Sequence, residues 1–134
     1  MNQLITLVSE SEEWLVERIL AYAKRQNYTP YTSTLAEAWR ASIAGLSASL
    51  IDSIKSDPRP QEFEPHLDFT SNPSAAFGVK EAKLHRSRGI QLGMFLGLMK
   101  YYRQCYLDLL DTSSLTPARY RQAALIIVRF FDSV

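Results

Sequence analysis

Residues 85–110, HRSRGIQLGMFLGLMKYYRQCYLDLL, constrain the fold more than any other stretch, because they form the longest apolar run in the chain. Gly89, Gly93 and Gly97 recur in it every four residues. At about 3.6 residues per turn, this spacing places all three on one stripe of a helix. Each glycine costs a helix about 1 kcal/mol relative to alanine. We therefore expect a neighbouring backbone, or a ligand, to lie close to this stripe. Of the two, we predict a neighbouring backbone, so that the stripe is a helix-packing surface.

The size and charge of the chain limit what it can be. Its 134 residues suffice for one hydrophobic core but not for two independent ones. Residues 1–134 are therefore expected to form a single domain. The formal net charge of +1 is far from the basic balance of a nucleic-acid-binding module, so no nucleic-acid partner is expected.

The cysteine content and the apolar runs bear on the compartment. Cys105 is the single cysteine, so the chain can form neither an internal disulfide nor a CxxC metal site. The N-terminal residues lack the basic start and long apolar core of a signal peptide. The uncharged run 89–99 is far shorter than the about 20 residues that span a bilayer. These features predict a cytoplasmic protein without membrane insertion and without a metal.

Apolar spacing predicts helices in the first half of the chain. Residues 3–26 read as one helix, whose apolar face consists of Leu4, Val8, Leu15, Ile19 and Tyr22. Thr34 and Glu37 form a capping box that starts a second helix. Its apolar ladder is Leu35, Trp39, Ile43, Leu46, Leu50 and Ile54. A second edge of small residues, expected to pack on the glycine stripe, consists of Ala41, Ala44, Gly45 and Ala48.

Prolines and a capping pair divide the second half. Prolines within 57–73 predict a surface connection, either functional or a passive crossover, and helical spacing resumes near Ser74. The sequence leaves open whether this helix continues straight or bends at Gly89. The side chains expected to point inward from the central helix are Leu92, Phe95, Leu96, Met99, Tyr102, Tyr106 and Leu110. Thr116 followed by Pro117 starts a last helix. The face expected to be apolar there consists of Tyr120, Ala124, Ile127, Val128 and Phe131.

Together these segments predict an all-α fold, a bundle of five to six helices with a globin-like or four-helix-bundle-like core. The last helix reaches Val134 without a glycine, proline or cap. We therefore expect that the natural chain continues and that residues 1–134 are the N-terminal part of a longer protein.

Candidate ligand-binding residues come from aromatic and polar side chains on these helices. Trp39, Arg40 and Tyr102 could line a small-molecule pocket, although the two rings could equally be core residues. His85 lies four residues before Gly89, on the same helical stripe as Gly89 and Gly93. These three residues are therefore also candidates for lining the ligand pocket.

A haem bound by His85 is the alternative to a chain without a cofactor. The basic neighbours Lys83, Arg86 and Arg88 favour a solvated face instead. We therefore predict no cofactor.

No residue set indicates catalysis. The chain has no glycine-rich phosphate loop, no HExxH, no GxSxG and no pair of carboxylates in an apolar context. Cys105 lies in the middle of a helix, where a buried and inert thiol is expected. No catalytic residue and no enzyme activity are predicted for this segment.

The first and last helices carry more apolar residues than one face of a surface helix can bury, which predicts a homodimer. The candidate interface residues are Leu4, Val8, Ile127, Phe130 and Phe131.

The segment 83–110 also carries a family resemblance. Its patterns R-x-R-G-I-x-L, F-L-x-L-x-K-x-Y-R and Y-x-D-L-L run from Arg86 to Leu110. In these patterns the chain resembles the non-haem, globin-like N-terminal sensory domains of bacterial signalling proteins, of the stressosome co-antagonist type and ahead of sensor histidine kinases. The resemblance implies a dimeric, cytosolic, non-catalytic input domain. Its last helix would pass a ligand- or partner-induced change to a downstream signalling module such as a kinase.

Overall fold

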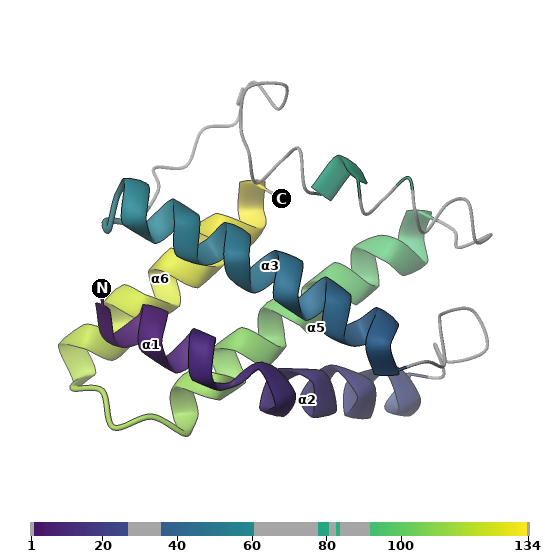
Figure 1. The fold of residues 1–134 in the computed structure, drawn as a ribbon, viewed down its shortest axis with the longest axis horizontal. Coiled ribbons are helices and arrows are strands. Elements are labelled where there is room, and N and C mark those ends of the chain that lie inside the picture. Colours follow the sequence, from purple (N-terminus) through teal and green to yellow (C-terminus); the bar gives the residue numbers. More distant parts are fainter. Residues whose placement is uncertain (1, 27–35, 61–77, 81–82, 84–91, 134) are drawn as a thin grey trace.

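The computed structural model describes residues 2–26, 36–60, 78–80, 83 and 92–133. Throughout these ranges every regular element is a helix, which confirms the all-α prediction (Figure 1). The helices are α1 (Asn2–Glu10), α2 (Glu12–Arg25), α3 (Ala36–Ser56), α5 (Leu92–Asp111) and α6 (Pro117–Ser133). None of the helices in these ranges is long and apolar enough to cross a membrane.

The helices pack as a bundle around one core. α5 and α6 lie side by side and run in opposite directions, joined by the turn at 112–116 (Figure 1). α3 contacts α1, α2 and α6, and α2 also contacts α5. Both of the first two helices thereby pack on α3.

The first helix is interrupted, so the prediction of one helix over 3–26 is wrong at Ser11. The amide of Ser11 donates to the carbonyl of Val8 at 3.3 Å, and its own carbonyl accepts from the Leu15 amide at 2.9 Å. Glu12 and Glu13 follow in the first turn of α2, where the helix dipole favours acidic side chains. The break preserves the apolar face: Leu4, Val8, Leu15 and Ile19 are all buried.

The apolar ladder of α3 is confirmed, but its small-residue edge is not a packing surface. Trp39, Ile43, Leu46, Leu50 and Ile54 are buried. By contrast Ala41, Ala44 and Ala48 are exposed to solvent. The large side chains direct α3 to the core, and the small residues lie on its outer side. Leu35 and the capping residue Thr34 fall outside the described ranges.

The core face of α5 alternates steps of three and four residues. Phe95, Leu98, Tyr102, Cys105 and Leu109 are buried along it. Tyr106 and Leu110 are buried as predicted, and Met99 packs partly buried against the core. Leu96, in contrast, is 51% exposed, so its predicted inward position is wrong.

The glycine stripe is not a packing surface at Gly93. This residue is exposed, and a Cβ atom built on it would meet no atom within 4 Å. Gly93 lies one turn before the exposed Leu96, on the side of α5 away from the core face. Gly89, the segment 61–77 and the question of a bend lie outside the described residues, although 78–80 are helical.

The start of α6 is confirmed, but its buried face differs from the predicted one. Thr116 Oγ1 accepts from the amide of Arg119 at 3.3 Å, and the Thr116 carbonyl accepts from the Tyr120 amide at 2.8 Å. The buried residues of α6 are Ala123, Ile126, Ile127, Phe130 and Ser133. Tyr120 is 37% exposed, because the helix is rotated relative to the predicted orientation.

This rotation places the candidate dimer residues in the core of a single chain. Leu4, Val8, Ile127 and Phe130 are each at most 1% exposed, and Phe131 packs partly buried against them. The physical reason is that α1 and α6 both pack on α3. The apolar faces that suggested a dimer are therefore largely covered within a single chain.

Candidate functional site

A groove of about 250 Å³ opens beside α5 and the end of α6. Its lining residues come from α5, from α6 and from the helical segment at 78–80: Gly78, Phe95, Leu96, Met99, Lys100, Arg103 and Phe131. Pockets for drug-sized ligands usually enclose about 300–1,000 Å³. This groove therefore fits a small ligand or a single large side chain.

Helical spacing on α5 builds most of the groove. Phe95, Met99 and Arg103 follow one another at four-residue steps and share one strip of the helix. Leu96 and Lys100 form the neighbouring strip, also four residues apart. Phe95 is 7% exposed and Leu96 is 51% exposed. The groove consequently has an apolar floor and an apolar lip that projects into water.

The rim of the groove is positively charged. Lys100 and Arg103 lie three residues apart and both line it, whereas no carboxylate of the described residues does. Among those residues, neither cation forms an ion pair. The groove thus combines an apolar interior with a rim that favours negative charge.

Phe131 connects the groove to the core. Its ring centroid lies 5.7 Å from that of Tyr106 on α5, and 5.2 Å from that of Phe130 in an edge-to-face arrangement. Tyr106 is fully buried, and its hydroxyl shares a 2.7 Å hydrogen bond with Ser47 Oγ on α3. Burial raises the pKa of Tyr106, so the phenol stays neutral. One wall of the groove is therefore in contact with a side chain that joins α5 to α3.

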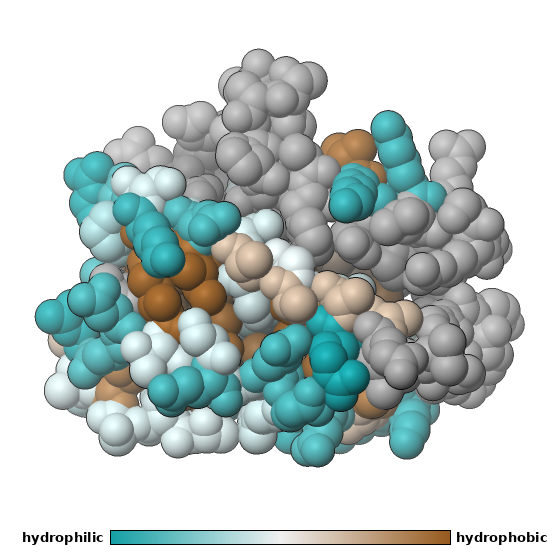
Figure 2. Space-filling model, in the orientation of Figure 1, coloured by the Kyte–Doolittle hydropathy of each residue, from teal (hydrophilic) through white to brown (hydrophobic). Residues whose placement is uncertain are grey.

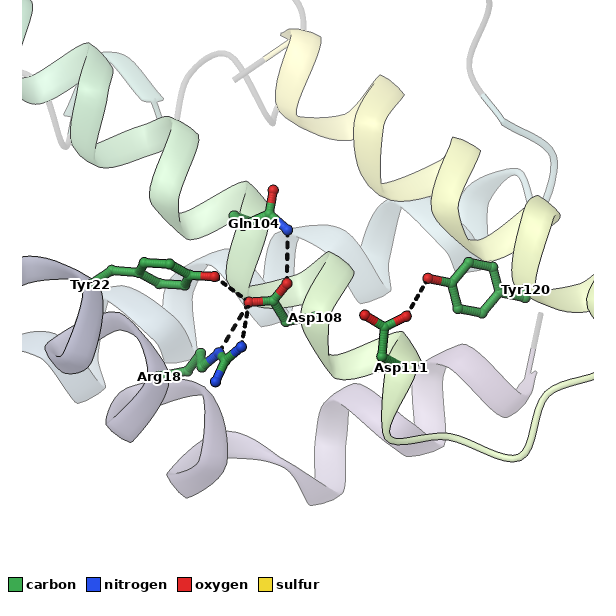
Figure 3. A network of polar contacts seen from close by, with 6 residues as sticks. All are labelled: Arg18, Tyr22, Gln104, Asp108, Asp111 and Tyr120. Atoms are coloured by element: carbon green, nitrogen blue, oxygen red, sulfur yellow. Dashed lines mark hydrogen bonds and ion pairs between the residues drawn. The ribbon is translucent and has the colours of Figure 1, made fainter. Parts of the chain in front are cut away.

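A second polar cluster lies between α2 and α5, centred on Asp108 (Figure 3). Its Oδ2 atom accepts from Arg18 Nε at 3.0 Å and from the Tyr22 hydroxyl, and its Oδ1 atom accepts from Gln104 Nε2 at 2.7 Å. Burial of Asp108 raises its pKa, but these three hydrogen bonds outweigh that effect and hold the pKa below its usual value of 3.8.

Aromatic contacts surround this cluster. The guanidinium of Arg18 lies 5.6 Å from the Trp14 ring and 5.5 Å from the Tyr22 ring. Tyr22 in turn lies 5.1 Å from Tyr101 between ring centroids. Because these groups satisfy one another, we interpret the cluster as a clamp that holds α2 on α5.

In the same view, the Tyr120 hydroxyl donates to Asp111 Oδ1 at 2.5 Å and joins the start of α6 to the end of α5 (Figure 3).

A wider hollow of about 580 Å³ lies between α1 and the turn after α5. Most of its lining residues are polar in type: Asn2, Gln3, Thr6, Leu7, Glu10, Thr112, Ser113, Ser114 and Leu115. Most of these side chains are exposed. The lining of the hollow is more polar than that of the groove, and no Lys or Arg of the described residues lines it. It is therefore the weaker candidate.

The structure separates the residues predicted to line a ligand pocket. Trp39 and Tyr102 are buried, with ring centroids 6.3 Å apart, and belong to the core. Arg40 instead forms a two-pronged ion pair with Glu13 at 2.8 and 3.0 Å. Gly93 is exposed, and a Cβ atom built on it would meet no atom within 4 Å. None of these four lines the groove. His85 and Gly89 lie outside the described residues, and the haem alternative at His85 lies there with them.

Cys105 is buried in the core, as predicted for an inert thiol. Burial raises the pKa of this thiol to about 12, so it remains protonated and unreactive at neutral pH. Across the ranges that the structure describes, no group of three His, Cys, Asp or Glu residues is placed to hold a metal ion.

Sequence reasoning missed the groove because its walls come from distant segments. Phe95 and Met99 were predicted to point inward, and Lys100 and Arg103 follow with the same helical spacing. That spacing was the available signal for one wall. The second wall, Phe131, was assigned to a dimer surface, and only the packing of α6 on α5 brings it to the groove.

Models of known protein families, curated proteins and solved structures were each compared with the chain, and none matches it.

Proposed function

We propose that this chain is a non-catalytic sensory domain, of the kind that precedes bacterial sensor kinases, and that the groove receives its signal. The observation that carries the proposal is the position of Phe131. This residue lies near the end of α6 and forms one wall of the groove. Whatever fills the groove therefore touches the helix that would pass a change onward.

The contacts of Phe131 explain how occupancy acts on α6. The ring packs on Tyr106 and Phe130, which are both buried. A ligand shifts a conformational equilibrium only by the difference in its affinity for the two states. An occupant that presses on Phe131 favours one arrangement of the end of α6 over others. In this proposal, that difference in affinity provides the sensory role.

The test uses the neutral apolar dye N-phenyl-1-naphthylamine together with hydrogen exchange. We expect the dye to fluoresce on binding and to slow amide exchange in residues 128–133, while exchange in α2 stays unchanged. Leu96→Asp at the lip should abolish dye binding without unfolding the chain. The matched control is Leu125→Asp, because Leu125 is 42% exposed but does not line the groove.

Two results would contradict the proposal. Absence of dye binding would remove the groove as a receiving site. Dye binding that leaves exchange in α6 unchanged would favour the alternative, a stand-alone small-ligand-binding helical protein, over a sensory domain.

A further inference from the structure

We propose that the natural occupant of the groove is an acidic protein segment that inserts one large apolar side chain, with its carboxylates over Lys100 and Arg103. The inference rests on the proposed function and specifies the partner of the same site. Three features carry it: the size of the groove, the charge around it and its concave shape.

The size of the groove suits one anchoring side chain. Its volume of about 250 Å³ lies below the range of drug-sized pockets. The interior is formed by Phe95, Met99 and Phe131. Met side chains adapt to irregular apolar partners, and an interface commonly depends on one buried aromatic or aliphatic anchor. A partner that inserts one Phe, Leu or Met would bury the exposed Leu96 at the same time.

The charge around the groove selects an acidic partner. Lys100 and Arg103 line the rim, and Gly78, which also lines the groove, is followed two residues later by Lys80. Lys80 and Lys83 are exposed. Figure 2 shows hydrophobic atoms next to hydrophilic ones at the upper right, where the segment 78–80 lies in Figure 1. Val79 in this segment is 49% exposed. A planar guanidinium such as that of Arg103 can bind a carboxylate through two parallel hydrogen bonds.

The shape of the site favours a protein segment over a membrane surface. An anionic bilayer is bound by apolar side chains that protrude from a basic face and enter the headgroup region. Here the apolar residues Phe95 and Met99 are recessed below Leu96, so a flat lipid surface would not reach them. An apolar side chain projecting from a peptide helix would reach them. Recognition of an amphipathic helix through such anchors is a common mode of peptide binding.

The test uses fluorescein-labelled peptides of about 15 residues, built of glutamate and alanine around one central Phe, Leu or Met, and a matched series with lysine for glutamate. We expect the glutamate series to bind at least about tenfold more tightly by fluorescence anisotropy. Replacing the central apolar residue by alanine should remove most of the binding. In 1 M NaCl, where the Debye length is about 3 Å, the preference for glutamate should largely disappear.

Matched variants locate the interaction. Lys100→Gln combined with Arg103→Gln should weaken binding of the acidic peptides by about fivefold or more at low salt, because each exposed ion pair contributes a modest share of the affinity. Arg121→Gln on α6 removes an exposed charge away from the groove and should leave peptide binding unchanged.

The outcomes separate this inference from the proposed function. Equal binding of both peptide series would overturn the inference, as would binding to vesicles of anionic lipid without binding to the acidic peptides. Dye binding with its effect on α6 would survive either result, so the sensory proposal would stand. Failure of dye binding itself would remove both.

Discussion

At the scale of single residues, Asp108 is the polar side chain whose replacement should lower the free energy of unfolding most clearly. Its side chain is 13% exposed, and it accepts hydrogen bonds from Arg18 and Tyr22 on α2. We expect Asp108→Asn to lower the free energy of unfolding by about 1–2 kcal/mol, because these donors lose a charged acceptor. Urea unfolding followed by tryptophan fluorescence measures it. Glu13 on α2, whose ion pair with Arg40 is exposed to solvent, is changed to Gln as the control and should alter stability little.

The same residue predicts a pH dependence. Because the folded-state pKa of Asp108 is lowered from 3.8, its ionised form stabilises the fold at pH values above 3.8. This contribution is lost as the pH falls through the lowered pKa. The stability difference between the wild type and Asp108→Asn should therefore shrink when unfolding is measured below pH 3.8. A difference that stays constant there would show that the carboxylate acts by packing rather than by charge.

Gly93 is a second position with a clear expectation. It is exposed in α5, and an added Cβ would meet no atom within 4 Å. We expect Gly93→Ala to raise the free energy of unfolding by about 0.5–1 kcal/mol, because alanine loses less backbone entropy in a helix. Thermal unfolding followed by circular dichroism tests this. A loss of stability would instead support the close packing of the glycine stripe that the sequence suggested.

At the scale of helices, the start of α6 depends on Thr116. Its Oγ1 atom accepts from the Arg119 amide at 3.3 Å, which is longer than an optimal hydrogen bond. We therefore expect Thr116→Val to cost about 0.5–1 kcal/mol, near the lower end for a lost helix cap. Thermal unfolding measures the cost. The exposed Ser114, changed to Ala, is the matched control and should leave the melting temperature unchanged.

At the scale of the whole molecule, α6 is part of the core rather than a free apolar surface. Phe130 is 1% exposed, and Leu125 on the same helix is 42% exposed. Phe130→Asp should cost more than about 3 kcal/mol, because it leaves a cavity and buries an unpaired charge, and helical circular dichroism should fall. Leu125→Asp should keep the fold. A folded Phe130→Asp variant that sediments as a monomer, beside a dimeric wild type, would instead support the interface predicted from sequence.

The sequence by itself determined the helical class and the start of the last helix. The Thr116–Pro117 start is a local signal, because a capping hydroxyl and a residue with fixed φ act within one turn. The buried ladder of α3 follows equally from spacing, since side chains three and four residues apart share a face whatever they pack against. A buried and inert Cys105 was likewise predictable, because this residue lies in the middle of a helix.

Only the tertiary structure decided which apolar faces meet and what is left open. Phe130 belongs to the core and Phe131 to the groove because α6 is rotated against α5, and no local pattern specifies that rotation. Gly93 follows the four-residue spacing that suggested close packing, yet an added Cβ atom there would meet no atom within 4 Å. Periodicity places residues on the face of a helix, but the partner of that face is set by contacts between segments far apart in the chain. The groove formed by Phe95, Arg103 and Phe131 is a property of those contacts.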